Sequence, residues 1–461
     1  MKQYLHSSGP TIIVSLQNIA YAAVSTCIDG RAQGELQDNV IILKLLLPRI
    51  SNDDKTTENC HNDTNKETLT QVIVEQQRSN AIQAVASYWE PKRKLLFYAV
   101  SLYDKSLAIY SVSIEKLKEN TKDSCDENMV EINPEVIHKA AKRCCSLSFA
   151  SIASEDDNKL PSVVIVAGDL NGDATAYCTE PIRSGKSHSR LLLGHTASML
   201  TSIEVVGDNK SSSKILTSDR DEKVRVSSFP NCFHVEGYLL GHSSYVSDVK
   251  IIPNAEYGST CLTCSGDKTL KLFDYETMQE ISTVSIPVNR NENDESSSIP
   301  VRLAVSTSGK LVAVMYDSFR CIELFSITID GNNTSIELVQ SIECSTLPLG
   351  ISFQDEKLNI LTQEPKLVRF AKGVDSLYHP INDNISMSLG SKLNSSNVMM
   401  PMSILEVDVN TGKIKLEKQE NKGKVGFVKN EPWMKRERIE VYKKGLQRRK
   451  QRKLEKDKPL S

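Results

Sequence analysis

Short apolar runs alternate with polar turns along most of this chain. Phe97–Val112 and Val312–Ile327 show the pattern: an apolar strand, a polar turn that contains aspartate, and a second apolar strand. Runs of four to eight β-branched and aromatic residues, bounded by Asp, Gly and Ser, are typical of strands rather than helices. The same pattern starts near Thr11 and ends with two expected strands at Met402–Val407 and Lys413–Lys418. The chain is therefore predicted to be all-β.

The pattern also repeats with a fixed period. Gly-His pairs end at His195 and His242, 47 positions apart, and Asp221 and Asp267 in the turns that follow are 46 apart. Gly-His followed by a turn aspartate, at a period of roughly 40–45 residues, is the signature of a WD-repeat blade. Residues 1–418 have room for about seven such blades and their inserts. We expect a WD-repeat β-propeller of about seven blades.

Polar segments interrupt this repeat, and a basic segment ends the chain. The segments 51–68, 118–128, 289–298 and 381–397 contain few residues able to bury apolar area, so they are expected to be loops on the propeller rim. From Gln419 the strand pattern stops and helix formers dominate. Between Lys443 and Lys458 there are nine Lys or Arg and two acidic residues. Residues 419–461 are predicted to form a basic C-terminal helix or tail.

Composition and motif content favour binding over catalysis. The chain has 461 residues and is nearly neutral, with 56 Lys+Arg against 58 Asp+Glu. Its 11 scattered cysteines do not form a disulfide framework, and no phosphate-binding glycine loop, nucleophile elbow or metal-ligand cluster occurs. Neither a signal peptide nor a membrane span is expected. The sequence predicts an intracellular protein without a metal or a cofactor of its own.

The repeat residues themselves have a structural explanation. In a WD blade the aspartate caps a tight turn, the imidazole of the Gly-His pair bonds to it, and a strand Ser or Thr completes the buried network. Such a network is favourable only if each polar group is satisfied, so we assign these residues to blade construction and not to catalysis. They are His195, Thr217 and Asp221 in one blade, and His242, Thr263 and Asp267 in the next.

One turn carries more charge than a blade needs. The segment Ser218–Val226 reads SDRDEKVRV, and Lys223 and Arg225 alternate with valines, so both cations lie on one face of a strand. Two interpretations are open. The face is solvated and holds ion pairs that contribute about 0–1 kcal/mol each, or it is a docking patch for a partner. The residues alone favour the solvated face.

At this turn the chain resembles a known family, the non-catalytic WD-repeat subunit of the eukaryotic tRNA (guanine-N7-)-methyltransferase. The resemblance is carried by ILTSDRDEKVRVS at Ile215–Ser227 and YLLGHSSYVSDV at Tyr238–Val249. HKAAKRCCSLSF at His138–Phe149, which runs into VAGDLNGDATAY, supports it upstream. Order and spacing fit from about His138 to Phe273, whereas the N-terminal third matches only as a propeller.

The resemblance implies a heterodimer. A separate catalytic subunit would bind S-adenosylmethionine and methylate N7 of a guanosine in the tRNA variable loop. This chain would bind no cofactor and would stabilise that subunit in its active conformation, in the nucleus, with the cytoplasm as a further location. In the family this turn and strand face the catalytic partner, which reverses the preference for a solvated face. The implied interface residues are Arg220, Asp221, Glu222, Lys223 and Arg225, with Asp221 still mainly the turn residue.

Two questions stay open at the level of sequence. The basic tail would contact tRNA phosphates, act as a nuclear-import signal, or form a solvated helix. The residues concerned are Lys443, Lys444, Arg448, Arg449, Lys450, Arg452 and Lys453. The alternative to the methyltransferase subunit is a generic WD-repeat scaffold of a ubiquitin-ligase or chromatin complex. An enzyme with its site in the propeller channel is a second alternative, for which the sequence offers no candidate residues.

Overall fold

The structure is a computed structural model. It describes residues 4–8, 11–16, 19–25, 40–48, 81–120, 129–152, 162–181, 189–196, 198–206, 213–253, 258–286, 299–317, 319–330, 333–354, 356–363, 366–381, 405–407 and 414–416. All structural statements below refer to these residues. The chain divides into two compact units, Met1–Ser396 and Asn397–Ser461.

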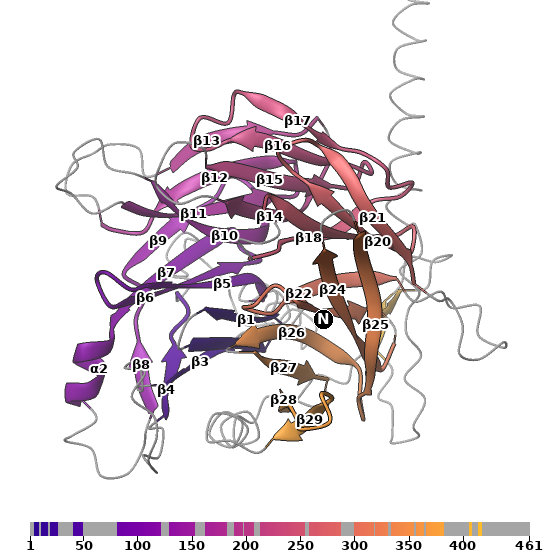
Figure 1. Ribbon diagram of the computed structural model, residues 1–461. Helices are drawn as coiled ribbons and strands as arrows, with labels where there is room; N and C mark the ends of the chain where they lie inside the picture. The colour runs from indigo at the N-terminus through magenta and orange to yellow at the C-terminus, as the bar shows by residue number, and fades with distance from the viewer. Residues whose placement is uncertain are drawn as a thin grey trace, which may run out of the picture. The chain divides into compact units, whose positions relative to one another are not determined.

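The first unit is a seven-bladed β-propeller, as the sequence predicts (Figure 1). Blade 1 contains β1 (Tyr4–Ser8), β2 (Thr11–Leu16), β3 (Ile19–Ser25) and β4 (Val40–Leu45). Blade 2 contains β5 (Ile82–Glu90), β6 (Leu95–Leu102), β7 (Ser106–Ser113) and β9 (Val136–Lys139). Blade 3 contains β10 (Cys144–Ile152), β11 (Ser162–Asp169), β12 (Asp173–Cys178) and β13 (Ser189–Gly194). Blade 4 contains β14 (Leu200–Val206), β15 (Lys214–Asp219), β16 (Val224–Ser228) and β17 (Val235–Leu239).

Three further blades complete the ring. Blade 5 contains β18 (Val246–Ile251), β19 (Thr260–Ser265), β20 (Thr269–Asp274) and β21 (Gln279–Ser285). Blade 6 contains β22 (Pro300–Val305), β23 (Leu311–Tyr316), β24 (Cys321–Asp330) and β25 (Asn333–Glu343). Blade 7 contains β26 (Pro348–Gln354), β27 (Lys357–Thr362), β28 (Leu367–Lys372) and β29 (Tyr378–Ile381).

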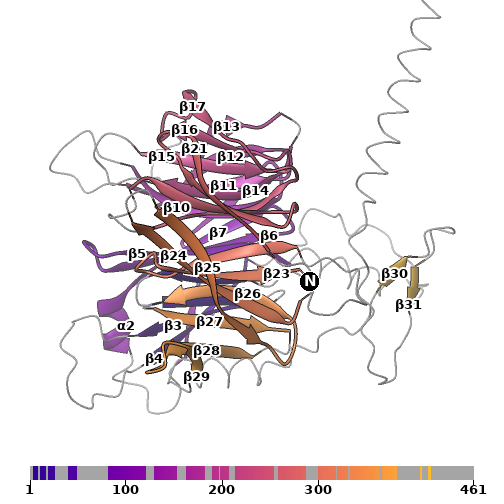
Figure 2. The same ribbon diagram turned by 45° about the vertical axis from the view of Figure 1, so that its right-hand side comes forward.

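The blades stack side by side around a central axis, as the turned view in Figure 2 also shows. The first strand of each blade lies innermost and packs against the first strand of the next, and β1 contacts both β5 and β26 to close the ring. Each blade is built from strands consecutive in sequence, apart from one exchange. Helix α2 (Ile114–Asn120) and β8 (Met129–Ile132) leave blade 2, and β8 adds to blade 1 in parallel with its outermost strand β4.

Some expected boundaries differ from the observed ones. Helix α2 occupies the start of the segment 118–128, which was expected to be a loop throughout. Blade 7 ends at Ile381. The two strands expected near the end of the chain are present as β30 (Leu405–Val407) and β31 (Ile414–Leu416), and they pair only with each other. The predicted inserts 51–68 and 289–298 and the predicted tail 419–461 lie outside the described residues.

Apolar side chains fill the space between neighbouring blades. Between blades 4 and 5, for example, Leu216 and Val226 pack with Val249, Cys261 and Phe273, and none of the five exposes more than 1% of its surface. Burial of each such side chain contributes about 1.5–3 kcal/mol. The alternation seen in the sequence therefore reflects strands whose two faces both meet another blade.

Both predicted His–Thr networks form, and they use one tautomer. In blade 5, His242 Nδ1 lies 2.9 Å from Asp267 Oδ2 and its Nε2 lies 2.7 Å from Thr263 Oγ1. An ionised carboxylate can only accept, so Nδ1 donates to Asp267 and Nε2 accepts from the threonine hydroxyl. Phe273 lies with its ring edge toward the imidazole. His242, Thr263 and Asp267 thus make the contacts expected of blade-construction residues.

In blade 4 the predicted aspartate is the wrong one. His195 Nδ1 lies 2.7 Å from Asp219 Oδ2, not from Asp221, and its Nε2 lies 2.8 Å from Thr217 Oγ1. Asp219 Oδ1 also accepts the backbone N–H of Asp221 at 2.8 Å. Asp219 thus closes the turn and binds the imidazole, whereas Asp221 has the sequence position of Asp267 but is exposed. The correction has a geometric cause: Asp219 ends β15 on the face that His195 covers.

We predict that Asp219→Ala lowers the free energy of unfolding by about 1–3 kcal/mol, because it leaves the buried His195 N–H and the Asp221 amide without acceptors. Asp221→Ala is the matched control and should stay within about 0.5 kcal/mol of the parent, as an exposed substitution does. Urea denaturation followed by circular dichroism measures both. Equal losses in the two variants would contradict the assignment.

We also predict that the free energy of unfolding depends on pH through the titration of His242. Burial lowers the pKa of His242, and the hydrogen bond and charge of Asp267 only partly offset this. In the unfolded chain histidine titrates near pH 6.5, so below that pH the unfolded state takes up a proton that the folded state does not. Stability present at pH 7 should fall as the pH drops through about 6.5, with a slope of at most about 1.4 kcal/mol per pH unit, and level off below the folded pKa.

The variants His242→Gln and His234→Gln test this dependence, because His234 is exposed and outside the network. Denaturation midpoints between pH 7.5 and 5 should lose part of their slope in the first variant only. This range lies above the titration of Asp267, whose pKa is lowered because hydrogen bonds from Thr269, Ser243 and His242 outweigh its burial. An unchanged slope in His242→Gln would refute the prediction.

Candidate partner interface

The turn between β15 and β16 presents the charged tip of blade 4. Arg220, Asp221 and Glu222 are exposed and Lys223 is half-buried. Glu222 has a φ of 74° and Lys268, at the same position of the blade 5 turn, has a φ of 67°. Both turns therefore have the same backbone, although the side chains at their tips differ. The turn of blade 4 therefore does not need the charged side chains at its tip in order to form.

The backbone of this turn is held at two points. Asp219 accepts the amide of Asp221, and Ser198 Oγ, itself 1% exposed, accepts the amide of Arg220 at 3.2 Å. Ser198 comes from the segment that leads into β14, so the turn is anchored to its own blade from both sides. A tip fixed in this way displays its charges with little loss of conformational entropy when a partner binds.

Lys223 has an aromatic neighbour that sequence analysis did not single out as part of a site. Its Nζ lies 5.7 Å from the centre of the Tyr238 ring, which is 41% exposed. Leu240, two positions farther along the outer edge of the blade, is 64% exposed. Tyrosine is enriched at protein interfaces, and its ring face attracts a nearby cation such as the Lys223 ammonium. We call Arg220–Lys223, Tyr238 and Leu240 the blade 4 patch.

Arg225 differs from Lys223 in its surroundings. Its Nε donates to Ser227 Oγ at 2.9 Å, and its two terminal nitrogens donate to the carbonyl oxygens of Gly194 and Cys232, each at 3.2 Å. Three of its five donors are therefore used inside the propeller. These contacts link β16 to β13 and to the turn before β17, and the place of Arg225 at the partner interface stays a prediction.

The structure also bears on the other candidate sites. Among the described residues, no group of three or more His, Cys, Asp or Glu is arranged to hold a metal ion. No helix in the described segments has the length and apolar content needed to cross a membrane. The basic residues Lys443, Lys444, Arg448, Arg449, Lys450, Arg452 and Lys453 lie outside the described residues, so their role in tRNA contact stays a prediction.

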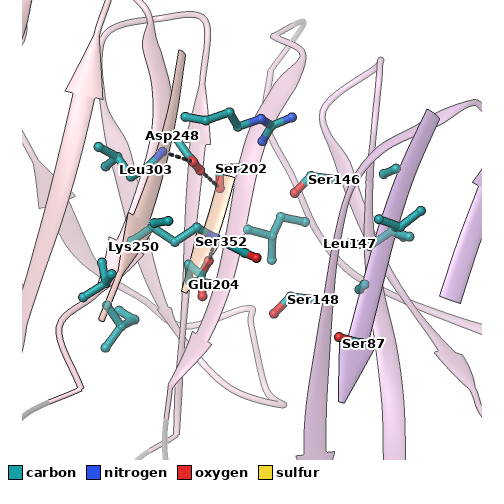
Figure 3. A pocket seen from close by; sticks show the side chains of 18 of the residues that line it. Ser87, Ser146, Leu147, Ser148, Ser202, Glu204, Asp248, Lys250, Leu303 and Ser352 are labelled. Carbon is teal, nitrogen blue, oxygen red and sulfur yellow. Dashed lines mark hydrogen bonds and ion pairs between the residues drawn. The ribbon is translucent and has the colours of Figure 1, made fainter. Parts of the chain in front are cut away.

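A second polar region, in the channel at the propeller axis, was not expected from the sequence. Glu204, Asp248, Lys250 and Arg302 line a cavity there of about 390 Å³. Figure 3 labels the first three of these residues. They come from the first strands of blades 4, 5 and 6. Their positions in the repeat carry no motif, so only the register of the strands reveals that they converge.

Comparisons with known proteins agree with the resemblance seen in the sequence. Residues 176–365 match the family described as the tRNA methyltransferase TRM82 WD40 domain. This region includes the whole of blade 4 and its charged turn. A chain from the crystal structure of the mitotic checkpoint complex overlaps 82% of this chain and 90% of its own length, with a TM-score of 0.48 and 13% identity, too distant to bear on function.

Three curated relatives carry the same descriptive name, tRNA (guanine-N(7)-)-methyltransferase non-catalytic subunit. The Aedes aegypti protein is 30% identical over 285 residues, 61% of each chain. The Danio rerio protein is 31% identical over 221 residues, 47% of this chain and 48% of its own. The Homo sapiens protein is 35% identical over 146 residues, 32% of this chain and 31% of its own. The matches thus span between about one third and three fifths of the relatives' lengths. Residues 176–365 are thus similar to the TRM82 WD40 domain, and the chain is similar to proteins named as non-catalytic subunits of tRNA (guanine-N(7)-)-methyltransferase.

Proposed function

We propose that this chain is the non-catalytic subunit of a heterodimeric tRNA (guanine-N7-)-methyltransferase. Its partner binds S-adenosylmethionine and methylates N7 of a guanosine in the tRNA variable loop, and this chain stabilises the partner in its active conformation. The complex works in the nucleus, with the cytoplasm as a further location. The proposal rests on the match of residues 176–365 to the TRM82 WD40 domain and on the names of the relatives.

The blade 4 patch is the surface that we assign to the partner. The single observation that carries this assignment is the division of labour between two aspartates. Asp219 closes the turn and binds His195, so the exposed carboxylates of Asp221 and Glu222 are not needed for either contact. Lys223 would pair with a carboxylate of the partner, and Tyr238 and Leu240 would bury apolar surface beside it.

The alternative, a generic scaffold of a ubiquitin-ligase or chromatin complex, would use the same fold. An exposed charged patch on a propeller does not by itself distinguish the two, because many partners fit such a surface. The partner recovered with the chain distinguishes them: an S-adenosylmethionine-binding methyltransferase for the first, ligase or chromatin subunits for the second.

The function predicts that tRNA methylation depends on this chain. The candidate catalytic subunit of the same organism should methylate N7 of guanosine in tRNA at least tenfold faster with the chain than without it, since a subunit held in its active conformation has a larger competent fraction. Methyl transfer from labelled S-adenosylmethionine, followed by mapping of 7-methylguanosine, measures this. An equal rate with and without the chain would overturn the proposal.

The patch predicts that Lys223→Glu weakens the complex. Reversal of one charge at a paired position should raise the Kd for the catalytic subunit at least tenfold, about 1.4 kcal/mol, mainly through loss of the ion pair. Lys268→Glu is the matched control, because it makes the same charge change in the corresponding turn of blade 5. Surface plasmon resonance on the two folded variants gives the comparison.

The control determines how the result is interpreted. Weaker binding in Lys223→Glu and unchanged binding in Lys268→Glu supports the blade 4 patch. Equal effects in both variants would show a general response to charge and not a contact at Lys223. Unchanged binding in Lys223→Glu would remove the patch assignment while leaving the proposed function to the methylation assay.

A further inference from the structure

The cavity at the propeller axis has a defined construction. In six blades the first strand carries a bulge or register irregularity at the same place, directly before one residue that faces its neighbours around the axis. These six equivalent residues are Ala84, Ser146, Ser202, Asp248, Arg302 and Gly350. All six line the cavity. We call them the first row; the residues two positions farther along each strand form the second row.

Charge is confined to one wall of this cavity. The first row carries Asp248 and Arg302 on blades 5 and 6, and the second row carries Glu204 and Lys250 on blades 4 and 5. In the same two rows, blades 2, 3 and 7 contribute small or hydroxyl-bearing side chains, Ala84, Ser146 and Gly350 among them. Small residues opposite long charged ones leave the space that the cavity occupies, as Figure 3 shows for the labelled side chains.

Three of the four charged side chains already have hydrogen-bond or ion-pair partners within the protein. Asp248 Oδ1 accepts from Ser202 Oγ at 2.7 Å and from its neighbour Val249 N at 3.0 Å, and Asp248 Oδ2 accepts from Leu303 N at 3.0 Å. Lys250 donates to Glu204 and forms an ion pair with it. These contacts give both carboxylates and the lysine a hydrogen-bond partner, although the donors to Asp248 are neutral and leave its charge in place. They leave one cation of the wall to consider.

The remaining cation is Arg302. Its guanidinium is half-buried and makes no hydrogen bond or ion pair with any residue that the structure describes. Across the cavity, the hydroxyls of Ser146 and Ser148 also make no side-chain hydrogen bond within the described part of the chain. A guanidinium offers five donors in a planar fork that matches a carboxylate or a phosphate. The cavity therefore combines a guanidinium whose donors are unused with hydroxyls on the opposite wall.

We propose that this channel is a binding site for a small hydroxylated oxyanion. Arg302 grips a carboxylate or phosphate oxygen pair, and Ser146 and Ser148 hydrogen-bond the hydroxyl groups at the other end of the ligand. A volume of about 390 Å³ lies in the range of small-molecule sites. The wall as a whole carries two positive and two negative side chains, and the ligand oxyanion would lie next to Arg302, whose donors are unused. This site is separate from the blade 4 patch and does not depend on the proposed function.

The test uses the full chain and isothermal titration with three probes at matched ionic strength. Gluconate represents a hydroxylated carboxylate, glycerol 3-phosphate a phosphate ester, and sorbitol a neutral polyol of similar size. We expect saturable binding of gluconate or glycerol 3-phosphate, and the better of the two identifies the oxyanion. Sorbitol should bind at least tenfold more weakly. Binding of neither anion, or equal binding of sorbitol, overturns the proposal.

Two variants locate the site. Arg302→Gln should weaken anion binding at least tenfold, whereas Arg320→Gln, an exposed arginine of the same blade, should leave it unchanged. Equal binding by Arg302→Gln and the parent would overturn the assignment. If Arg302→Gln does not fold, Ser146→Ala provides the decision: it should weaken binding two- to tenfold, and unchanged affinity in that variant overturns the proposal.

Discussion

The propeller depends on the side-chain contacts that hold the first strands of its blades together at the axis. Apart from the backbone pairing of β8 with β4, neighbouring blades are joined by contacts of their side chains. Asp248 on blade 5 connects three blades: its carboxylate accepts hydrogen bonds from Ser202 on blade 4 and from the backbone N–H of Leu303 on blade 6. It is 1% exposed, and a carboxylate so buried is stable only because donors from three blades surround it. Farther out, Lys214 bridges blade 4 to Glu276 of blade 5.

The propeller could be predicted from the sequence because its blades repeat one local arrangement. The period of His195 and His242 and the strand pattern depend on residues that lie close together in sequence. The choice between Asp219 and Asp221 could not be made in this way. Both flank the same turn, and the period favours Asp221, but the side of the strand that meets His195 favours Asp219. A hydrogen bond depends on direction as well as spacing, and direction follows from where β15 ends.

The two candidate sites also differ in how far each could be predicted from the sequence. The blade 4 patch was visible in the sequence because its charges are contiguous, although the place of Tyr238 beside Lys223 follows only from the pairing of β16 with β17. The channel site was invisible, because Ser146 and Arg302 are more than 150 positions apart in the chain. They meet because equivalent bulges bring equivalent positions of six strands to the axis. No local sequence pattern indicates that residues so far apart in the chain lie around one cavity.

The second aspartate of the blade 4 turn also affects how this surface can change over time. In blade 5, Asp267 both closes the turn and holds His242, so substitution there removes a structural contact. In blade 4, Asp219 makes both of these contacts, so they place no requirement on the residues at the tip of the turn. We therefore expect the exposed Asp221 and Glu222 to tolerate exchange, even with inverted charge, without loss of the fold. Such a turn is suited to coevolution, because complementary changes on two proteins can accumulate there and yield pairs that no longer recognise the pairs of other lineages.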